Sequence, residues 1–272
     1  MTVRKKFILL SIFIFFIVTI LSITITFNEK EVEKFNSNNS LNVIEEKKVD
    51  IVLKKLKINK KTPDFSSFKD VKQKKNEFFE FIYPMVVNNN LEIIEQRKLI
   101  ETSIEFNEEI KELCKYYRIE CNKNNYKEKF LKQVNIIPAS LTLAQAANES
   151  AWGTSRFARK ANNYFGQWCF TKGCGIVPKK RSGNAQHEVQ SFKHVSDSVK
   201  SYVRNLNSHP AYKELRDIRN KEGFSGKKLA KGLSKYSERG EHYIKEIQSM
   251  ISYNKLQKYD QKMAKFLNIE WK

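Results

Sequence analysis

The chain has 272 residues, of which 50 are basic and 30 acidic, so its formal net charge is +20. A chain of this length can form one sizeable domain with appendages, and its charge favours a polyanionic neighbour such as nucleic acid, anionic lipid or cell wall. The sequence has no zinc-finger, helix-turn-helix or RNA-binding pattern, which argues against nucleic acid.

The first predicted element is a membrane anchor. Residues 7–27 contain no charged side chain and follow a basic cluster within residues 1–6. As a helix the segment would span about 31 Å, the thickness of a bilayer's hydrocarbon core, with the basic cluster in the cytoplasm. A cleaved signal peptide would have a shorter apolar stretch and a small-x-small site, so the sequence favours an uncleaved, single-pass anchor in the cytoplasmic membrane, with the remainder exported.

A tether is predicted to follow the anchor. Residues 28–62 contain no Gly or Pro, are rich in Asn, Lys and Glu, and have only scattered apolar residues. As a flexible chain they would span roughly 30 to 35 Å, enough to lift a catalytic domain off the membrane. A short amphipathic helix at 49–58 is the alternative for part of this segment.

Residues 63–135 are predicted to form a helical N-terminal lobe that continues into the catalytic domain without a polar linker. Apolar residues recur at helical spacing in two runs, and a triplet of asparagines predicts a break between them. The first run extends from Val71 to Met85, and the triplet is Asn88–Asn90. The second run extends from Ile94 to Tyr117 and includes Ile104. A third, shorter helix is predicted at 126–134, and the aromatic residues are expected to form the core.

A helix with one acid near its end organises the rest of the chain. Pro138 suits its first turn and Gly153 the position just past its end, so the helix is predicted at 138–152. Its many small residues indicate close packing. Glu149 would lie near the negative end of the helix dipole with Trp152 as an apolar wall, and both effects raise its pKa, as a general acid requires. A solvated helix-end glutamate is the alternative.

Two amides and three aromatic residues are candidate substrate contacts, namely Gln145, Asn148, Tyr164, Phe165 and Trp168. The amides share a helix face with Glu149. Gly166 allows a sharp turn that would bring the aromatic residues close to the acid, where they could stack on a pyranose ring. Burial in the core is the alternative, and it is favoured for Phe165.

A small β lobe is predicted at 173–192, because a turn signal at 181–184 separates two short extended segments. Glu188 in the second segment is the candidate for a carboxylate that acts together with Glu149. An ordinary surface glutamate is an equal alternative.

Four cysteines in an exported domain predict disulfides. Proximity in the sequence favours Cys114 with Cys121 and Cys169 with Cys174, although four cysteines allow three connectivities. A zinc site is disfavoured by the spacing and by the lack of a nearby histidine pair. Neither a metal nor a cofactor is expected.

The C-terminal part is predicted to be helical scaffold. Ser196–Ser198 can cap a helix that ends before His209, and Ser225 opens another short helix. The last clear helix begins near Tyr243 and turns three isoleucines inward. The Lys-rich tail at 257–272 is predicted to be a surface helix.

Three segments carry a resemblance to a known family: Asn148–Gly153 (Asn-Glu-Ser-Ala-Trp-Gly), Asn162–Gly166 (Asn-Asn-Tyr-Phe-Gly) and His242–Lys245 (His-Tyr-Ile-Lys). With them the chain resembles the glucosaminidase-type hydrolases of glycoside hydrolase family 73, and among these the Bax-type proteins. The resemblance implies an α+β, mainly α, lysozyme-like catalytic domain at 136–256 that cleaves the β-1,4 bond after N-acetylglucosamine in peptidoglycan. It also implies that Tyr243 reaches the cleft near the reacting sugar. Ile244 and Glu246 depart from the residues that many relatives carry after this tyrosine.

The expected reaction is glycoside hydrolysis, in which Glu149 protonates the departing oxygen while an oxocarbenium-like charge forms on the sugar. Glu188 would act as the base that activates a water or as the nucleophile that attacks the charged sugar. Attack by the substrate's own 2-acetamido group is the alternative. A lytic transglycosylase that leaves anhydro-muramic ends and a catalytically silent wall-binding protein are the alternative functions. The expected partners are peptidoglycan glycan strands and, through residues 7–27, the inner membrane.

Overall fold

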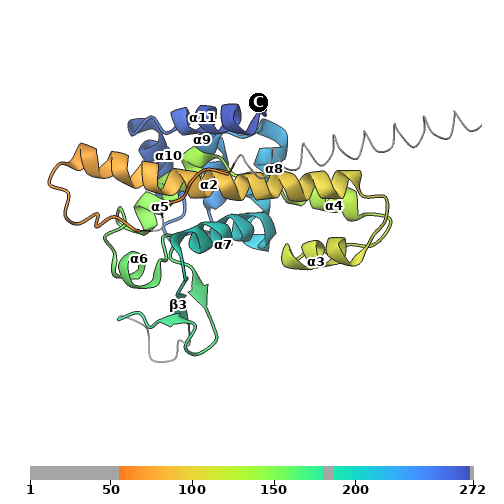
Figure 1. Ribbon diagram of the computed structural model, residues 1–272, viewed down its shortest axis with the longest axis horizontal. Helices are drawn as coiled ribbons and strands as arrows, with labels where there is room; N and C mark the ends of the chain where they lie inside the picture. The colour runs from red at the N-terminus through yellow and green to blue at the C-terminus, as the bar shows by residue number, and fades with distance from the viewer. Residues whose placement is uncertain (1–54, 60, 180–186, 270–272) are drawn as a thin grey trace, which may run out of the picture. The chain divides into compact units, whose positions relative to one another are not determined.

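The computed structural model describes residues 55–59, 61–179 and 187–269 (Figure 1). The predicted anchor, nearly all of the predicted tether and the turn signal at 181–184 lie outside the described residues. Within the described ranges, no helix is long and apolar enough to cross a membrane. The described residues from Leu56 onward belong to one unit.

The described chain is mainly helical, with one small antiparallel sheet. Its elements are α2 (Val71–Thr102), α3 (Glu108–Tyr116), α4 (Tyr126–Gln133), α5 (Ala139–Glu149), α6 (Arg156–Ala161), β1 (Trp168–Cys169), β2 (Gly175–Ile176), β3 (Glu188–Gln190), α7 (Val195–Ser208), η1 (Pro210–Tyr212), α8 (Lys213–Glu222), α9 (Gly226–Leu229), η2 (Ala230–Leu233), α10 (Glu241–Tyr253) and α11 (Gln257–Leu267). The expected mainly helical α+β architecture is confirmed for this part of the chain and is consistent with a lysozyme-like domain.

Helix α5 is the buried centre of the fold. Every residue from Ala139 to Ala147 is buried, and α2, α9, α10 and α11 pack against the helix. Its small side chains allow this close approach. At Gly226, in the first turn of α9, an added Cβ would lie 2.2 Å from Oγ of Ser140, so only glycine fits between α9 and the start of α5.

The central helix is shorter than the predicted 138–152. Pro138 precedes its first turn, and the helix ends at Glu149. Ala151, Trp152 and Gly153 then have φ of 49°, 59° and 76°, in the left-handed region. Such a conformation costs an alanine or a tryptophan about 1 to 2 kcal/mol. Here the packing of Trp152 on the rings of α2 offsets that cost.

The break predicted at Asn88–Asn90 is wrong, because α2 continues through the triplet and through Pro84. Asn88 exchanges two hydrogen bonds with the backbone of Leu56. Asn90 does the same with Ile137, the residue that leads into Pro138 and α5. These asparagines therefore bind neighbouring segments to α2, where they satisfy backbone groups that would otherwise be buried without partners.

Two further expectations are wrong. Ile104, expected within a helical run, lies in the connection between α2 and α3 with 95% of its surface exposed. The tail, expected to be a surface helix, forms α11. This helix instead packs on α5 and α2 and buries Tyr259 and Met263. Helix α8 was not predicted.

Helices α7 and α10 follow their predicted patterns, and both supply residues of the site described below. α7 ends before His209 as predicted, but its N-cap is His194 rather than a residue of Ser196–Ser198. Asp197 completes the cap from inside the helix, where its side chain accepts a hydrogen bond from the N–H of His194. α10 buries its isoleucines and carries Tyr243 in its first turn.

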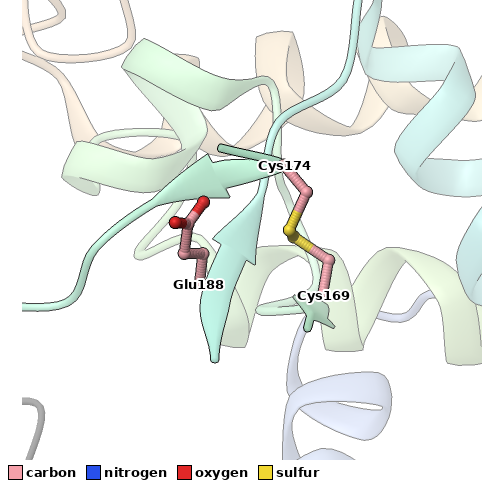
Figure 2. Close-up of side chains that lie close together, drawn as sticks. All are labelled: Cys169, Cys174 and Glu188. Carbon is pink, nitrogen blue, oxygen red and sulfur yellow. A yellow bond between two sulfur atoms is a disulfide. The ribbon is translucent and has the colours of Figure 1, made fainter. Parts of the chain in front are cut away.

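The small sheet has the order β1-β3-β2. Trp168 pairs with Val189, and Gly175 pairs with Gln190. Strand β1 was not predicted, because two residues are too few to show an alternating pattern. Both disulfides join the pairs favoured by proximity, Cys114–Cys121 and Cys169–Cys174. The second lies beside Glu188 of β3 (Figure 2).

Candidate active site

Glu149 lies at the C-terminal end of α5 with its side chain half-buried. Its Oε1 accepts a hydrogen bond from the hydroxyl of Tyr243 at 2.7 Å. Its Oε2 lies near Gly166, where an added Cβ would be 3.9 Å away. Gly166 has a φ of 66°, so the turn that brings this backbone to the acid favours glycine, as the sequence predicted.

A directional chain of hydrogen bonds extends inward from Glu149. The amide nitrogen of Gln145 donates to the hydroxyl oxygen of Tyr243 at 2.8 Å, and the amide oxygen of Gln145 accepts from Tyr202 at 2.5 Å. Because the tyrosine oxygen receives the amide proton, its own proton points to Oε1 of Glu149. A neutral Glu149 therefore carries its acidic proton on Oε2, the oxygen beside Gly166.

Burial raises the pKa of Glu149 above its ordinary value and is the largest influence on it. Hydrogen bonds from Tyr243 and Asn148 and the charge of Arg239 lower the pKa, while the charge of Glu246 raises it. The predicted direction is confirmed. Trp152, the predicted apolar wall, packs on Phe78 and Phe79 of α2.

Tyr236 and Arg239 complete the surroundings of Tyr243. The ring of Tyr236 stacks on that of Tyr243 with centroids 5.5 Å apart, and its hydroxyl donates to the carbonyl of Phe165. The guanidinium of Arg239 lies 5.4 Å from the centroid of the Tyr243 ring and forms an ion pair with Glu246 at 2.7 Å. Sequence reasoning missed Tyr236 and Arg239, because both lie in an irregular segment before α10 with no periodicity to single them out.

Three of the five predicted substrate contacts are buried. Gln145 is held between two tyrosines, Tyr164 packs on Phe78, and Phe165 stacks on Tyr202 with ring centroids 4.1 Å apart. These three side chains support the site from inside and have no surface to offer a glycan. This corrects the predicted role of Gln145 and Tyr164 and confirms the burial that was favoured for Phe165.

Asn148 and Trp168 remain accessible. Asn148 is half-buried next to the acid. Trp168 is 58% exposed and stacks on the ring of His187 with centroids 4.0 Å apart. An exposed tryptophan held flat by a neighbouring ring is suited to contact a sugar or peptide.

Glu188 is committed to the fold of the β lobe. One carboxylate oxygen accepts from the N–H of Gly173 at 3.0 Å and the other from the N–H of Gly175 at 2.8 Å. Its predicted role as the partner of Glu149 is therefore disfavoured. Glu188 also lies with Cys169 and Cys174 in a group with the spacing of metal ligands. The two sulfurs are joined in a disulfide and so are not thiolate ligands (Figure 2).

Comparisons with known proteins show what the chain is similar to. Residues 123–256 match the family model described as Glucosaminidase, mannosyl-glycoprotein endo-beta-N-acetylglucosaminidase. This range contains Glu149, Gln145, Tyr202 and Tyr243. Protein bax of Escherichia coli (strain K12) is 30% identical over 207 residues, which cover 71% of this chain and 74% of that protein.

Among solved structures, the catalytic domain of the autolysin Auto from Listeria monocytogenes is similar at 18% identity with a TM-score of 0.43. The match covers 79% of this chain and 97% of that one.

Proposed function

The chain belongs to the glucosaminidase family, in its Bax-type branch, and from this premise we propose that it is an endo-β-N-acetylglucosaminidase that cleaves the β-1,4 bond after N-acetylglucosamine in peptidoglycan. The observation that carries the proposal is the buried chain from Tyr202 through Gln145 and Tyr243 to Glu149. It directs the tyrosine proton to Oε1, so that a protonated Glu149 carries its own proton on Oε2, beside Gly166.

Glu149 acts as the general acid. Burial raises its pKa and so favours the protonated side chain, and Oε2 delivers the proton to the departing glycosidic oxygen. The carboxylate that forms is stabilised by the hydrogen bond from Tyr243 and by the charge of Arg239. Because these contacts favour the ionised form, they strengthen as the proton leaves, and so they stabilise the transition state more than the ground state.

The substrate's own 2-acetamido group stabilises the positive charge that forms on the sugar. Glu188 is the carboxylate that the sequence nominates, but both its oxygens accept hydrogen bonds from backbone N–H groups of the β lobe. Attack by the acetamido oxygen on the anomeric carbon requires no second protein carboxylate. This route suits a site with one protonated acid.

The chemical identity of the released ends tests the proposal. Peptidoglycan digested with the protein and examined by mass spectrometry should show reducing N-acetylglucosamine ends. Anhydro-muramic ends would instead establish a lytic transglycosylase. Binding to the wall without any release of fragments would establish a silent wall-binding protein.

Replacing Glu149 by Gln tests the acid itself. The amide cannot donate a proton to a leaving oxygen, so we expect turnover to fall by at least about 100-fold, the usual contribution of a general acid. Binding to the wall should persist. Glu128→Gln, at an exposed position on α4, is the matched control and should leave turnover unchanged. Near-normal turnover in Glu149→Gln would rule out the assigned role.

Residues 7–27 anchor the protein in the cytoplasmic membrane, with the catalytic domain on the extracytoplasmic side. The uncharged segment and the preceding basic cluster support this placement. Two disulfides in the described chain also support it, since such bonds persist in oxidising compartments.

A further inference from the structure

A polar hollow of about 220 Å³ lies between α7 and the small sheet. Trp168 and Gln190 line it from the sheet, and Arg204, Asn205 and Ser208 line it from α7. Arg118, in the connection after α3, also lines the hollow. None of these residues belongs to the chain of hydrogen bonds that ends at Glu149.

Two cationic side chains, Arg118 and Arg204, line this hollow. Neither Arg118 nor Arg204 forms an ion pair with any carboxylate in the part of the chain that the structure describes. Arg204 is held in place, because its Nε donates to the carbonyl of Tyr116 at 2.8 Å and its guanidinium lies 4.3 Å from the centroid of the Tyr116 ring. Its terminal nitrogens are left without a protein acceptor among the described residues.

A third lining residue, Gln167, is also incompletely paired. Its amide nitrogen donates to the carbonyl of Ser198 at 3.2 Å. Its amide oxygen is buried and accepts no hydrogen bond from the described residues. Buried polar atoms are normally paired, so this wall of the hollow is incomplete without a further donor.

Each disulfide constrains a segment that contributes a lining residue to the hollow. Arg118 lies inside the loop closed by Cys114 and Cys121, and Trp168 directly precedes Cys169, which is bonded to Cys174. Cross-links of this kind reduce the freedom that a binding surface loses when a ligand binds. The segments that carry Arg118 and Trp168 are thus both constrained where they line the hollow.

The hollow lies close to the acid. Gly166, beside Oε2 of Glu149, is two residues from Trp168, a backbone span of at most about 7 Å. On α7, Tyr202 reaches the acid through Gln145, while Ser201 on a neighbouring face lines the hollow. A polymer bound across Glu149 can therefore place a side branch in the hollow.

We propose that this hollow binds a carboxylate of the acidic peptides that branch from the glycan strand of peptidoglycan. This inference rests on the proposed function. Unpaired guanidinium groups match the geometry and charge of a carboxylate. Small-molecule sites usually have volumes of roughly 300 to 1,000 Å³, so this smaller hollow suits one amino-acid-sized group better than a disaccharide. Its amides and hydroxyls can pair with the peptide's N–H and C=O groups.

The proposal predicts a preference for glycan that carries peptides. Turnover is compared on intact wall and on the same wall stripped of its peptides by an amidase. The wild-type protein should have a lower KM for the intact wall. Arg118→Gln and Arg204→Gln should each raise that KM by about tenfold and leave kcat and activity on stripped glycan unchanged. Lys123→Gln removes one exposed positive charge outside the hollow and should change neither KM.

Binding of the peptides that the amidase releases, measured by calorimetry, gives a readout independent of cleavage. The wild-type protein should bind them and Arg118→Gln should bind them at least tenfold more weakly. Equal KM on both substrates together with no binding of free peptides would overturn the site and leave the proposed function standing. Absence of cleavage on both substrates would refute the proposed function. The calorimetric binding of free peptides would then be the only test of whether the hollow is a peptide site.

Discussion

Glu149 is subject to two opposing influences, and burial is the stronger of them. Burial disfavours the charged carboxylate, while Tyr243, Asn148 and Arg239 favour it. Burial thus favours the protonated form of Glu149, and the same site has contacts that stabilise the anion formed when the proton leaves. Its protonation state should therefore respond to neighbouring charges in a predictable direction.

Variants of Arg239 and Glu246 test how the pKa of Glu149 responds to neighbouring charges. Arg239 lowers the pKa of Glu149 and Glu246 raises it. The alkaline limb of kcat/KM reports loss of the acid's proton in the free enzyme. Arg239→Gln should therefore move this limb to higher pH and Glu246→Gln should move it to lower pH. The double variant should lie between them. Shifts of both single variants in the same direction would contradict this account.

Glu188→Gln separates a catalytic carboxylate from a structural one. Gln retains one acceptor for the N–H groups of Gly173 and Gly175 but turns an NH₂ group toward the other. Loss of one hydrogen bond to a charged group costs about 1.5 to 3 kcal/mol. We expect a lower melting temperature or faster proteolysis of the β lobe, with kcat within about threefold of wild type. A catalytic base or nucleophile would instead cost a factor of at least about 100 in kcat.

Among the helices, α5 depends on α11 for its first turn. Pro138 provides no side-chain cap. Asp260 of α11 supplies one from a distance, because its carboxylate accepts from the N–H of Ser140 at 2.8 Å and from its hydroxyl at 2.5 Å. The expected catalytic domain ends at residue 256, as does the family match. The helix that presents Glu149 is therefore supported from outside that range.

Asp260 should make the stability of the fold depend on pH. It is 3% exposed, and burial raises its pKa from 3.8 to about 6. Between about pH 4 and pH 6 the folded state thus binds more protons than the unfolded state, so the free energy of unfolding falls as pH rises through this range. Two pKa units correspond to about 3 kcal/mol.

Asp260→Asn tests this dependence. The amide keeps an acceptor for the N–H of Ser140 but does not titrate, so denaturant unfolding measured from pH 4 to pH 7 should lose most of this slope. Asp217→Asn, on the exposed surface of α8, is the control and should keep the slope. A slope that survives in Asp260→Asn would assign it to another group.

On the scale of the whole molecule, the expected N-terminal lobe and catalytic domain share one packed unit. Helix α2 packs along α4 of the lobe, along α5 and α7 of the catalytic domain, and along α11 of the tail (Figure 1). Asn90 of α2 also binds the backbone of Ile137 at the entrance to the central helix. Truncation at residue 135 would remove these contacts from α5.

The proposed membrane anchor at residues 7–27 can be tested by fractionation. The full chain should remain in the membrane fraction at about 1 M salt, where the Debye length is only about 3 Å. A chain that lacks residues 1–27 should be released. Salt resistance distinguishes an inserted helix from adsorption of a protein with a net charge of +20. Release of the full chain by salt would contradict the anchor, and a mature N-terminus beyond residue 27 would establish a cleaved signal.

The sequence by itself determined the features that depend on nearby residues. Helical periodicity defined α7 and α10, short separation indicated both cysteine pairs, and a lone glutamate between Pro138 and Gly153 indicated the acid with its raised pKa. Caps, helical repeats and turns act over a few residues, so their signals are legible along the chain. The motifs around Glu149 and Tyr243 also indicated the family.

Only the tertiary structure decided which groups satisfy one another. Tyr243 is 94 residues from Glu149, Tyr202 is 57 from Gln145, and Asp260 is 120 from Ser140. The same packing placed Gln145 and Tyr164, which were expected to contact substrate, in the core beside Phe165, and it paired Glu188 with backbone N–H groups. A buried polar atom takes whichever partner the fold brings within reach. That choice follows from distances in space, on which local sequence patterns carry no information.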